Sequence, residues 1–233
     1  MPNRNAIWKA LAAFVTAIAV AACSGCTPQP RALTLTLVRQ GDWQTGGRLN
    51  TDPPGPSLTE EGQSQAQQLA TQLAPNKYDA IYASSLVRTQ QFAAPLAQKL
   101  GKQIEILPGL NQFAAGSYDH QLLSADEKLY YQAPRQWLAG NRQEHIPGSL
   151  DGNQFNDQFG GAVKTIYDSG HTNPIAISSG GAVEIWTLMN VKNAKPSLLD
   201  SHPLQFGAQV VITGSPATGW TLVDWGGLRG DFS

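Results

Sequence analysis

Cysteine is nearly absent from this 233-residue chain, and its two copies, Cys23 and Cys26, both lie before residue 27. A disulfide-stapled scaffold and a four-thiolate zinc site are therefore excluded. Charged residues make up only 14% of the chain, which argues against a coiled coil, and the formal net charge of −1 gives no reason to expect a general nucleic-acid binder. Hydrophobic residues make up 41%, enough to build a core, so a chain that is disordered throughout is excluded as well.

A long apolar run is missing too. The run over residues 10–22 has thirteen residues, whereas a membrane-spanning helix needs roughly 20. It follows Arg4 and Lys9, as the apolar region of a secretory signal does. It ends in Val-Ala-Ala-Cys at residues 20–23, which resembles the bacterial lipobox and implies a diacylated Cys23 as the first mature residue. Two alternatives stay open: an ordinary signal peptide with an incidental cysteine, and lipidation at Cys26.

These signals divide the chain into a lipoprotein signal peptide (1–22), a lipidated tether (23–31) and one domain (32–233). Removal of the signal peptide takes away two basic residues and no acidic one, so the formal net charge goes from −1 to −3. We therefore expect acyl chains, not a basic patch, to hold the protein on the outer face of the bacterial cell membrane. A body of this size can fold on its core without a disulfide.

Strand and helix patterns alternate along the domain. Apolar periodicity predicts an α/β fold, a three-layer α/β/α sandwich around a mainly parallel sheet. Residues 109–154 read as irregular, and Asp151 reads as a turn residue. The predicted strands are 33–38, 78–83, 103–107, 174–178, 209–213 and 220–225, and the predicted helices begin near 59, 86, 155 and 180.

Three predicted strand ends carry polar segments marked by glycine or serine. Residues 39–41 read Arg-Gln-Gly, residues 84–89 read Ser-Ser-Leu-Val-Arg-Thr, and residues 178–181 read Ser-Ser-Gly-Gly. The carboxyl ends of parallel strands meet at one edge of a sheet, where such folds bind ligands. Two arginines, Arg39 and Arg88, and the N-terminus of a helix would therefore lie together. Guanidinium forks and free helix N–H groups both bind phosphate oxygens, so this edge is a candidate phosphate cradle.

Five segments in order, residues 37–41, 58–66, 84–89, 110–116 and 178–181, resemble the motifs of the histidine phosphatase superfamily, the phosphoglycerate mutase-like proteins. The family motifs are Arg-His-Gly after a strand, Leu-Thr-x-x-Gly-x-x-Gln-Ala, Ser-Ser-x-x-Arg-Thr, Leu-x-Glu-x-x-x-Gly and Ser-His-Gly-Gly. The match covers residues 33–225. It implies a phosphoglycerate mutase-like fold with a phosphate site formed by Arg39, Gly41, Arg88 and Gly180.

The chain departs from the family at the positions that carry its chemistry. Family members form a phosphohistidine on the first histidine, helped by a second histidine and an acid. Here these positions hold Gln40, Ser179 and Gln112, and the Thr and Asn usual after the first histidine are Trp43 and Gly46. An amide nitrogen is conjugated with its carbonyl and is no nucleophile. The substitutions predict a catalytically impaired protein, because loss of a nucleophile costs on the order of 10⁶ in kcat.

Three functions remain open: a non-catalytic binder of a phosphorylated or anionic ligand or of a protein partner, an active phosphomonoesterase that uses another group, and a scaffold whose pocket has no function. In the second, His120 or His145 would reach the pocket. In the third, Arg39 would pair with Asp42, and Arg88 would cap its own helix. We expect no cofactor, and no metal site either, because the four histidines lack paired spacing and the body has no cysteine.

Overall fold

The computed structural model describes residues 30–43, 46–122, 129–230 and 232. The predicted signal peptide, Cys23 and Cys26 lie outside the described residues. None of the helices in the described part of the chain is long and apolar enough to cross a bilayer.

Six strands form one sheet in the order β3-β2-β4-β1-β5-β6. Strands β3, β2, β4 and β1 pair in parallel, whereas β5 and β6 add an antiparallel edge. The predicted mainly parallel sheet is therefore confirmed. The strands are β1 (Leu33–Arg39), β2 (Ile81–Ala83), β3 (Ile104–Ile106), β4 (Ile175–Ser178), β5 (Gln209–Ser215) and β6 (Gly219–Trp225).

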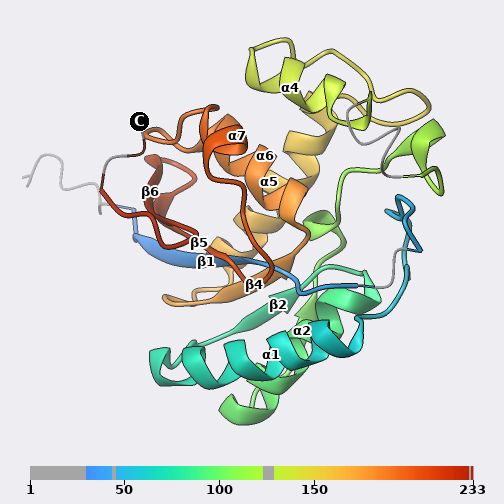
Figure 1. Ribbon diagram of the computed structural model, residues 1–233. Coiled ribbons are helices and arrows are strands. Elements are labelled where there is room, and N and C mark those ends of the chain that lie inside the picture. The colour runs from blue at the N-terminus through green and yellow to red at the C-terminus, as the bar shows by residue number, and fades with distance from the viewer. Residues whose placement is uncertain (1–29, 44–45, 123–128, 231, 233) are drawn as a thin grey trace, which may run out of the picture.

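Helices cover both faces of the sheet, so the predicted three layers are confirmed. Helices α1 and α2 lie on one face, and α5, α6 and α7 lie on the other (Figure 1). The helices are α1 (Glu60–Leu73), α2 (Val87–Leu100), α4 (Gln132–Leu138), α5 (Gly152–Asp168), α6 (Gly180–Asn190) and α7 (Leu198–Ser201), with 3₁₀ turns η1 (Ala74–Asn76), η2 (Pro108–Leu110) and η3 (Gly116–Tyr118).

The alternation of β1 explains the two layers of core. Leu33, Leu35 and Leu37 point into the larger core beneath α5 and α6, and Val38 points into the smaller core beneath α1 and α2. Side chains alternate between the faces of a strand, so one strand serves both cores. This buried central strand carries Arg39 at its carboxyl end.

The region that the sequence left irregular contains more structure than expected. Helix α4 lies within it, and α5 begins at Gly152 instead of residue 155. Asp151 is the N-cap of α5: its Oδ1 accepts from Gln154 N at 2.8 Å, and Gln154 Oε1 accepts from Asp151 N at 2.9 Å. The turn assignment for Asp151 was thus wrong. The reciprocal bonds form a capping box, which satisfies N–H groups that a helix start otherwise leaves unbonded.

Candidate functional site

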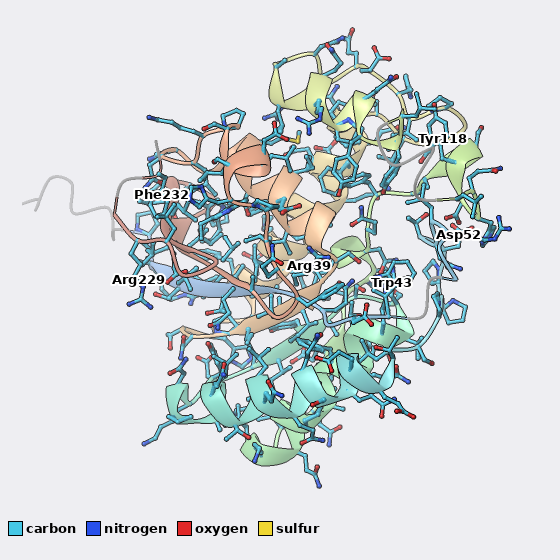
Figure 2. All side chains as sticks on the ribbon, in the orientation of Figure 1. Arg39, Trp43, Asp52, Tyr118, Arg229 and Phe232 are labelled. Carbon is cyan, nitrogen blue, oxygen red and sulfur yellow. The ribbon has the colours of Figure 1, made fainter. Side chains whose placement is uncertain are left out.

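A cavity of about 730 Å³ opens at the carboxyl end of β1, where all three predicted strand-end segments meet. Arg39 ends β1 and Gln40 follows it, Arg88 lies in the first turn of α2, and Ser179 is the N-cap residue of α6, which begins at Gly180. Figure 2 shows Arg39 and Trp43 near this end of the sheet, with Arg229 on the other side of the molecule in this view. The sequence prediction that Arg39 and Arg88 share one hollow agrees with this geometry.

Arg39 is half-buried in the wall of the cavity. Its Nη1 donates to the carbonyl oxygen of Leu204, and its guanidinium carbon lies 4.3 Å from the centre of the Phe206 ring. Its Nε is buried and has no hydrogen-bond acceptor among the described residues. The alternative pairing with Asp42 is not formed there, because Asp42 Oδ2 accepts from Thr59 Oγ1 at 2.7 Å.

Arg88 is 98% buried, with an exposed fraction of 2%. Its Nη2 donates to Asn50 O at 3.1 Å, and its guanidinium carbon lies 4.3 Å from the centre of the Trp43 ring. Nε and Nη1 have no acceptor in the described part of the chain. Burial lowers the pKa of Arg88 to about 10, so the side chain is still charged at neutral pH. The N-cap of α2 is Leu86, so Arg88 is not the cap of its own helix.

Gln40 and Ser179 form the part of the floor where the family carries its two histidines. Both are buried, and Gln40 Oε1 and Ser179 Oγ each have no hydrogen-bond partner among the described residues. No histidine lines the cavity within the described ranges. The rescue that the sequence left open, through His120 or His145, therefore has no support in the geometry.

Gln112, at the position of the family's acid, uses its whole amide to hold the cavity wall. Its Oε1 accepts from Ala182 N at 3.0 Å, and its Nε2 donates to Tyr130 Oη at 2.8 Å. Tyr130 in turn donates to Phe113 O at 2.6 Å. The side chain therefore bonds one of the free N–H groups of α6 and has no proton to transfer.

Two glycines act by allowing close approach. A Cβ at Gly180 would lie 2.8 Å from Arg39 Cδ, and a Cβ at Gly181 would lie 2.5 Å from the hydroxyl oxygen of Tyr131. Gly41 was also predicted to bind phosphate, but it does not line the cavity; a Cβ there would meet Phe92 at 2.6 Å.

The segment 58–66, which carries the second motif, fixes the loop after β1. Thr59 caps α1 by accepting from Gly62 N at 3.0 Å, and Gln65 Oε1 accepts from Asp42 N at 2.9 Å. A Cβ at Gly62 would lie 1.9 Å from Asp42 O. Leu58 forms a bridge with Trp43, the residue on which Arg88 stacks. This segment therefore positions the cavity wall without entering the cavity.

Sequence reasoning missed Glu184, Phe206 and the Tyr130–Tyr131 pair, all of which line the cavity. Burial raises the pKa of Glu184 to about 7, although a hydrogen bond from Leu204 N at 2.8 Å and the charge of Arg39 both lower it. One signal for Glu184 was available, because it is the single charged residue in the apolar helix sequence Gly180–Asn190. The aromatic residues carried no comparable signal.

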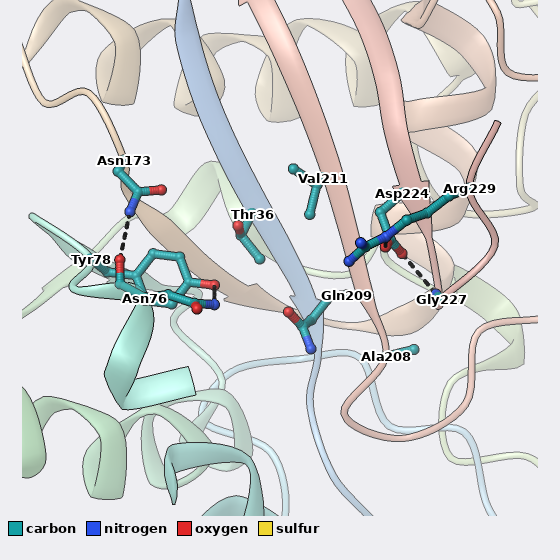
Figure 3. Close-up of a pocket in the computed structure, with 11 residues that line it drawn as sticks. Thr36, Asn76, Tyr78, Asn173, Ala208, Gln209, Val211, Asp224, Gly227 and Arg229 are labelled. Atoms are coloured by element: carbon teal, nitrogen blue, oxygen red, sulfur yellow. Dashed lines mark hydrogen bonds and ion pairs between the residues drawn. The ribbon is translucent and has the colours of Figure 1, made fainter. Parts of the chain in front are cut away.

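A second hollow, of about 570 Å³, lies beside β1, β5 and β6 (Figure 3). Its buried carboxylate is already satisfied by the chain: Asp224 Oδ1 accepts from Gly227 N at 2.7 Å, and Oδ2 accepts from Arg229 Nε at 2.6 Å. None of the five motifs contributes to it. The larger cavity is therefore the candidate site.

The chemistry of the cavity is that of an anion site. The guanidinium groups of Arg39 and Arg88 and the N-terminus of α6 offer donors to phosphate-like oxygens. A third arginine of the lining, Arg135, is paired with Asp200. The carboxyl groups of the cavity, Asp42 and Glu184, do not form a metal-binding set with other ligands. Within the described residues, the one cluster with metal-ligand spacing is Asp52, Asp119 and His120, and none of these lines the cavity.

Known proteins resemble this chain over most of its length. PE-PGRS family protein PE_PGRS11 of Mycobacterium tuberculosis is 41% identical over 218 residues, which cover 85% of this chain and 37% of that protein. This chain thus spans about a third of that relative. A mycobacterial glucosyl-3-phosphoglycerate phosphatase superposes with a TM-score of 0.70 at 16% identity, covering 85% of this chain and all of the other. The α-ribazole phosphatase of Shigella flexneri gives 0.63 at 20%, covering 83% and 96%.

The structural neighbours establish the fold, and a sequence model of a protein family identifies the family. The model described as "Histidine phosphatase superfamily (branch 1)" matches residues 35–227. That range includes Arg39, Arg88 and the start of α6. The chain belongs to the histidine phosphatase superfamily.

Proposed function

We propose that this protein is an envelope lipoprotein whose domain binds a phosphorylated ligand without transferring the phosphoryl group. One observation carries the binding part. Arg39 Nε, Arg88 Nε and Arg88 Nη1 are buried donors with no acceptor among the described residues. A buried N–H donor without an acceptor is costly, so the oxygens of a bound anion are the natural partners.

The absence of transfer follows from the floor of the cavity. The amide of Gln40 has no nucleophilic nitrogen, and the amide of Gln112 has no acidic proton. Ser179 has a hydroxyl, but its Oγ has no hydrogen-bond partner within the described ranges. A serine needs an adjacent base to become a nucleophile. Ser179 therefore offers the ligand a hydrogen bond and not a nucleophile.

The size and walls of the cavity favour an organic phosphate over inorganic phosphate. Its volume is about 730 Å³, and Trp43, Phe206, Tyr130 and Tyr131 line it beside the two arginines. Ligand sites commonly combine apolar and aromatic walls with a few polar groups. The names of the structural neighbours, phosphatases of phosphorylated small molecules, support the same ligand class.

Binding is tested by calorimetric titration of the protein with inorganic phosphate and with a sugar phosphate. We expect wild type to bind the sugar phosphate more tightly, and Arg39→Met to abolish both heats. Arg229→Met is the matched control, because Arg229 is an exposed arginine paired with Asp224 away from the cavity; it should bind as wild type does. Equal binding by the wild type and by Arg39→Met would refute the proposed site.

Absence of transfer is tested by hydrolysis of p-nitrophenyl phosphate. We expect no turnover above a mock preparation from wild type. Enzyme-like turnover that disappears in Arg39→Met would instead identify an active phosphomonoesterase.

The anchoring part of the proposal rests on the sequence around residue 23. Lipidation there would place the domain on the outer face of the bacterial membrane. Cys23→Ser should lose fatty-acid labelling and move the protein from the membrane fraction to the soluble fraction. Cys26→Ser should keep the labelling and stay in the membrane fraction. The reverse pattern would place the lipid on Cys26. If the wild-type protein takes up no labelled fatty acid, lipidation is refuted.

A further inference from the structure

We propose a divalent transition-metal site outside the cavity, formed by Asp52, Asp119 and His120. Each offers one ligand atom, and these atoms all lie within 4.8 Å of one another. Asp52 belongs to the loop between β1 and α1, and the other two follow η3. Figure 2 shows Asp52 and Tyr118, the neighbour of Asp119, in the same part of the molecule. The site departs from the sequence expectation of no metal, which considered histidines and cysteines alone.

Asp119 supplies the observation that points to a ligand. Its side chain is 9% exposed, and its Oδ2 is buried and accepts no hydrogen bond from any described residue. The nearest ring nitrogen among the described residues, His120 Nε2, is 3.7 Å away, beyond hydrogen-bond distance. A buried carboxylate oxygen without a donor is costly to retain. A metal ion between Oδ2 and Nε2 would satisfy both atoms.

The other oxygen of Asp119 is held as the carboxylates of metal sites are. Oδ1 accepts from Thr51 N at 3.0 Å and from Thr51 Oγ1 at 3.2 Å. Such hydrogen bonds orient a ligating group and leave its second oxygen for the metal. The backbone of His120 is fixed as well, because its N donates to Leu49 O at 3.0 Å and its O accepts from Arg48 Nη1 at 2.8 Å.

The remaining side chains are free to complete the coordination. Asp52 and His120 are exposed, so both can rotate, and an ion can reach them from solvent. In a tetrahedral zinc site with bonds of about 2.1 Å, ligand atoms are ~3.4 Å apart, so the 3.7 Å separation needs little movement. One imidazole with two carboxylates suits Zn²⁺ better than Mg²⁺, which prefers oxygen ligands alone.

A metal here would clip two segments that border the cavity. Leu49, Asn50 and Thr51 line the cavity, and Asn50 O accepts from Arg88 Nη2. Asp119 already contacts Thr51. The ion would add a second link, from Asp52 to the segment after η3, and so hold the wall beside Arg88.

Equilibrium dialysis of the full chain against Zn²⁺ in phosphate-free buffer tests the site, together with the melting temperature. We expect Asp52→Asn and His120→Ala to bind one Zn²⁺ fewer than wild type, or to bind it about tenfold more weakly or worse, and to lose the zinc-induced rise in melting temperature. His145→Ala, which removes another exposed histidine, should match wild type. Both cysteines are present in every variant, so their binding cancels in the comparison.

Mg²⁺ at the same concentration should raise the melting temperature of none of these proteins. The site is refuted if Asp52→Asn and His120→Ala bind Zn²⁺ as wild type does, or if wild type gains no stability from Zn²⁺. Both variants change exposed side chains, so a folding failure is not expected. Their melting temperatures without metal verify this.

Discussion

The segment 58–66 and the floor of the cavity differ in whether their polar side-chain atoms have hydrogen-bond partners. In the segment, Thr59 and Gln65 have partners, which fix Asp42 and the start of α1. In the floor, Gln40 Oε1 and Ser179 Oγ are buried and have no partner among the described residues. Each such atom costs about 1–3 kcal/mol. The family-like residues of the segment are therefore explained by folding alone, whereas the floor calls for a ligand.

The largest effect is expected when the family's catalytic residues are restored in the floor of the cavity. The triple variant Gln40→His/Gln112→Glu/Ser179→His should hydrolyse p-nitrophenyl phosphate on the order of a thousandfold faster than wild type, because lost nucleophiles cost rates of this order or more. Steady-state turnover is the measurement. The same triple variant with Arg39→Met is the control. If the triple variant folds, binds phosphate and still gives no turnover, the cavity does not present phosphate to residue 40.

A steric clash in the segment 58–66 should weaken ligand binding in the cavity, although the segment does not line it. Gly62→Ala places a Cβ 1.9 Å from the carbonyl oxygen of Asp42, and overpacking of this kind costs about 3 kcal/mol. We expect lower stability in denaturant unfolding together with weaker phosphate binding. Full stability in Gly62→Ala would show that the segment does not constrain the loop after β1.

The raised pKa of Glu184, which lines the cavity, gives a test by pH dependence. Burial raises it from 4.5 to about 7, so between these values the folded chain binds more protons than the unfolded chain. The free energy of unfolding therefore falls as pH rises across that interval, by on the order of 3 kcal/mol at most. Glu184→Gln keeps an acceptor for Leu204 N and should remove this fall. Denaturant unfolding at several pH values is the measurement, and an unchanged pH profile in the variant would contradict it.

Arg88→Met should separate binding from stability. The variant keeps an apolar side chain of similar length but removes a buried cation whose Nε and Nη1 lack acceptors in the described residues. We expect a melting temperature no lower than that of wild type without ligand, and no rise when phosphate is added. Saturating ligand at 100 times Kd should stabilise wild type by about 2.7 kcal/mol. Phosphate stabilisation that persists in Arg88→Met would refute its role.

The smallest expected change in stability comes from replacing a glycine that has open space around it. A Cβ at Gly161, in α5, meets nothing within 4 Å, so Gly161→Ala should stabilise the protein by about 0.5–1 kcal/mol through helix propensity. It serves as the matched control for Gly62→Ala in the same unfolding assay. A loss of stability here would mean that α5 packs more tightly than its contacts indicate.

The sequence predicted what periodicity and strand-end motifs encode. Alternation in residues 33–38 placed β1, and the polar segments after three strands placed Arg39, Arg88 and Ser179 at one sheet edge. It failed where long-range contacts decide the structure. Helix α4 has no strong periodicity and is held by aromatic packing, with Trp137 stacked on Phe155 at 5.8 Å between ring centres.

The site shows the same division. Gln40 and Gln112 were located because they occupy motif positions. Phe206 reaches the cavity from the loop before β5 and stacks on Arg39, a contact that no local pattern encodes. Asp119 and His120 are neighbours in sequence, but Asp52 joins them only through the fold.

The direction of β1 has a consequence for a chain tied to a bilayer. Arg31, just before the strand, stacks on Tyr167, and Tyr167 Oη donates to Arg31 O at 3.0 Å. These contacts fix the position of the chain where it enters β1. Arg39 lies eight residues after Arg31 and ends this seven-residue strand, which is about 20 Å long. An acyl anchor ahead of Arg31 would therefore join the domain at the amino end of β1, opposite to the strand end that carries Arg39.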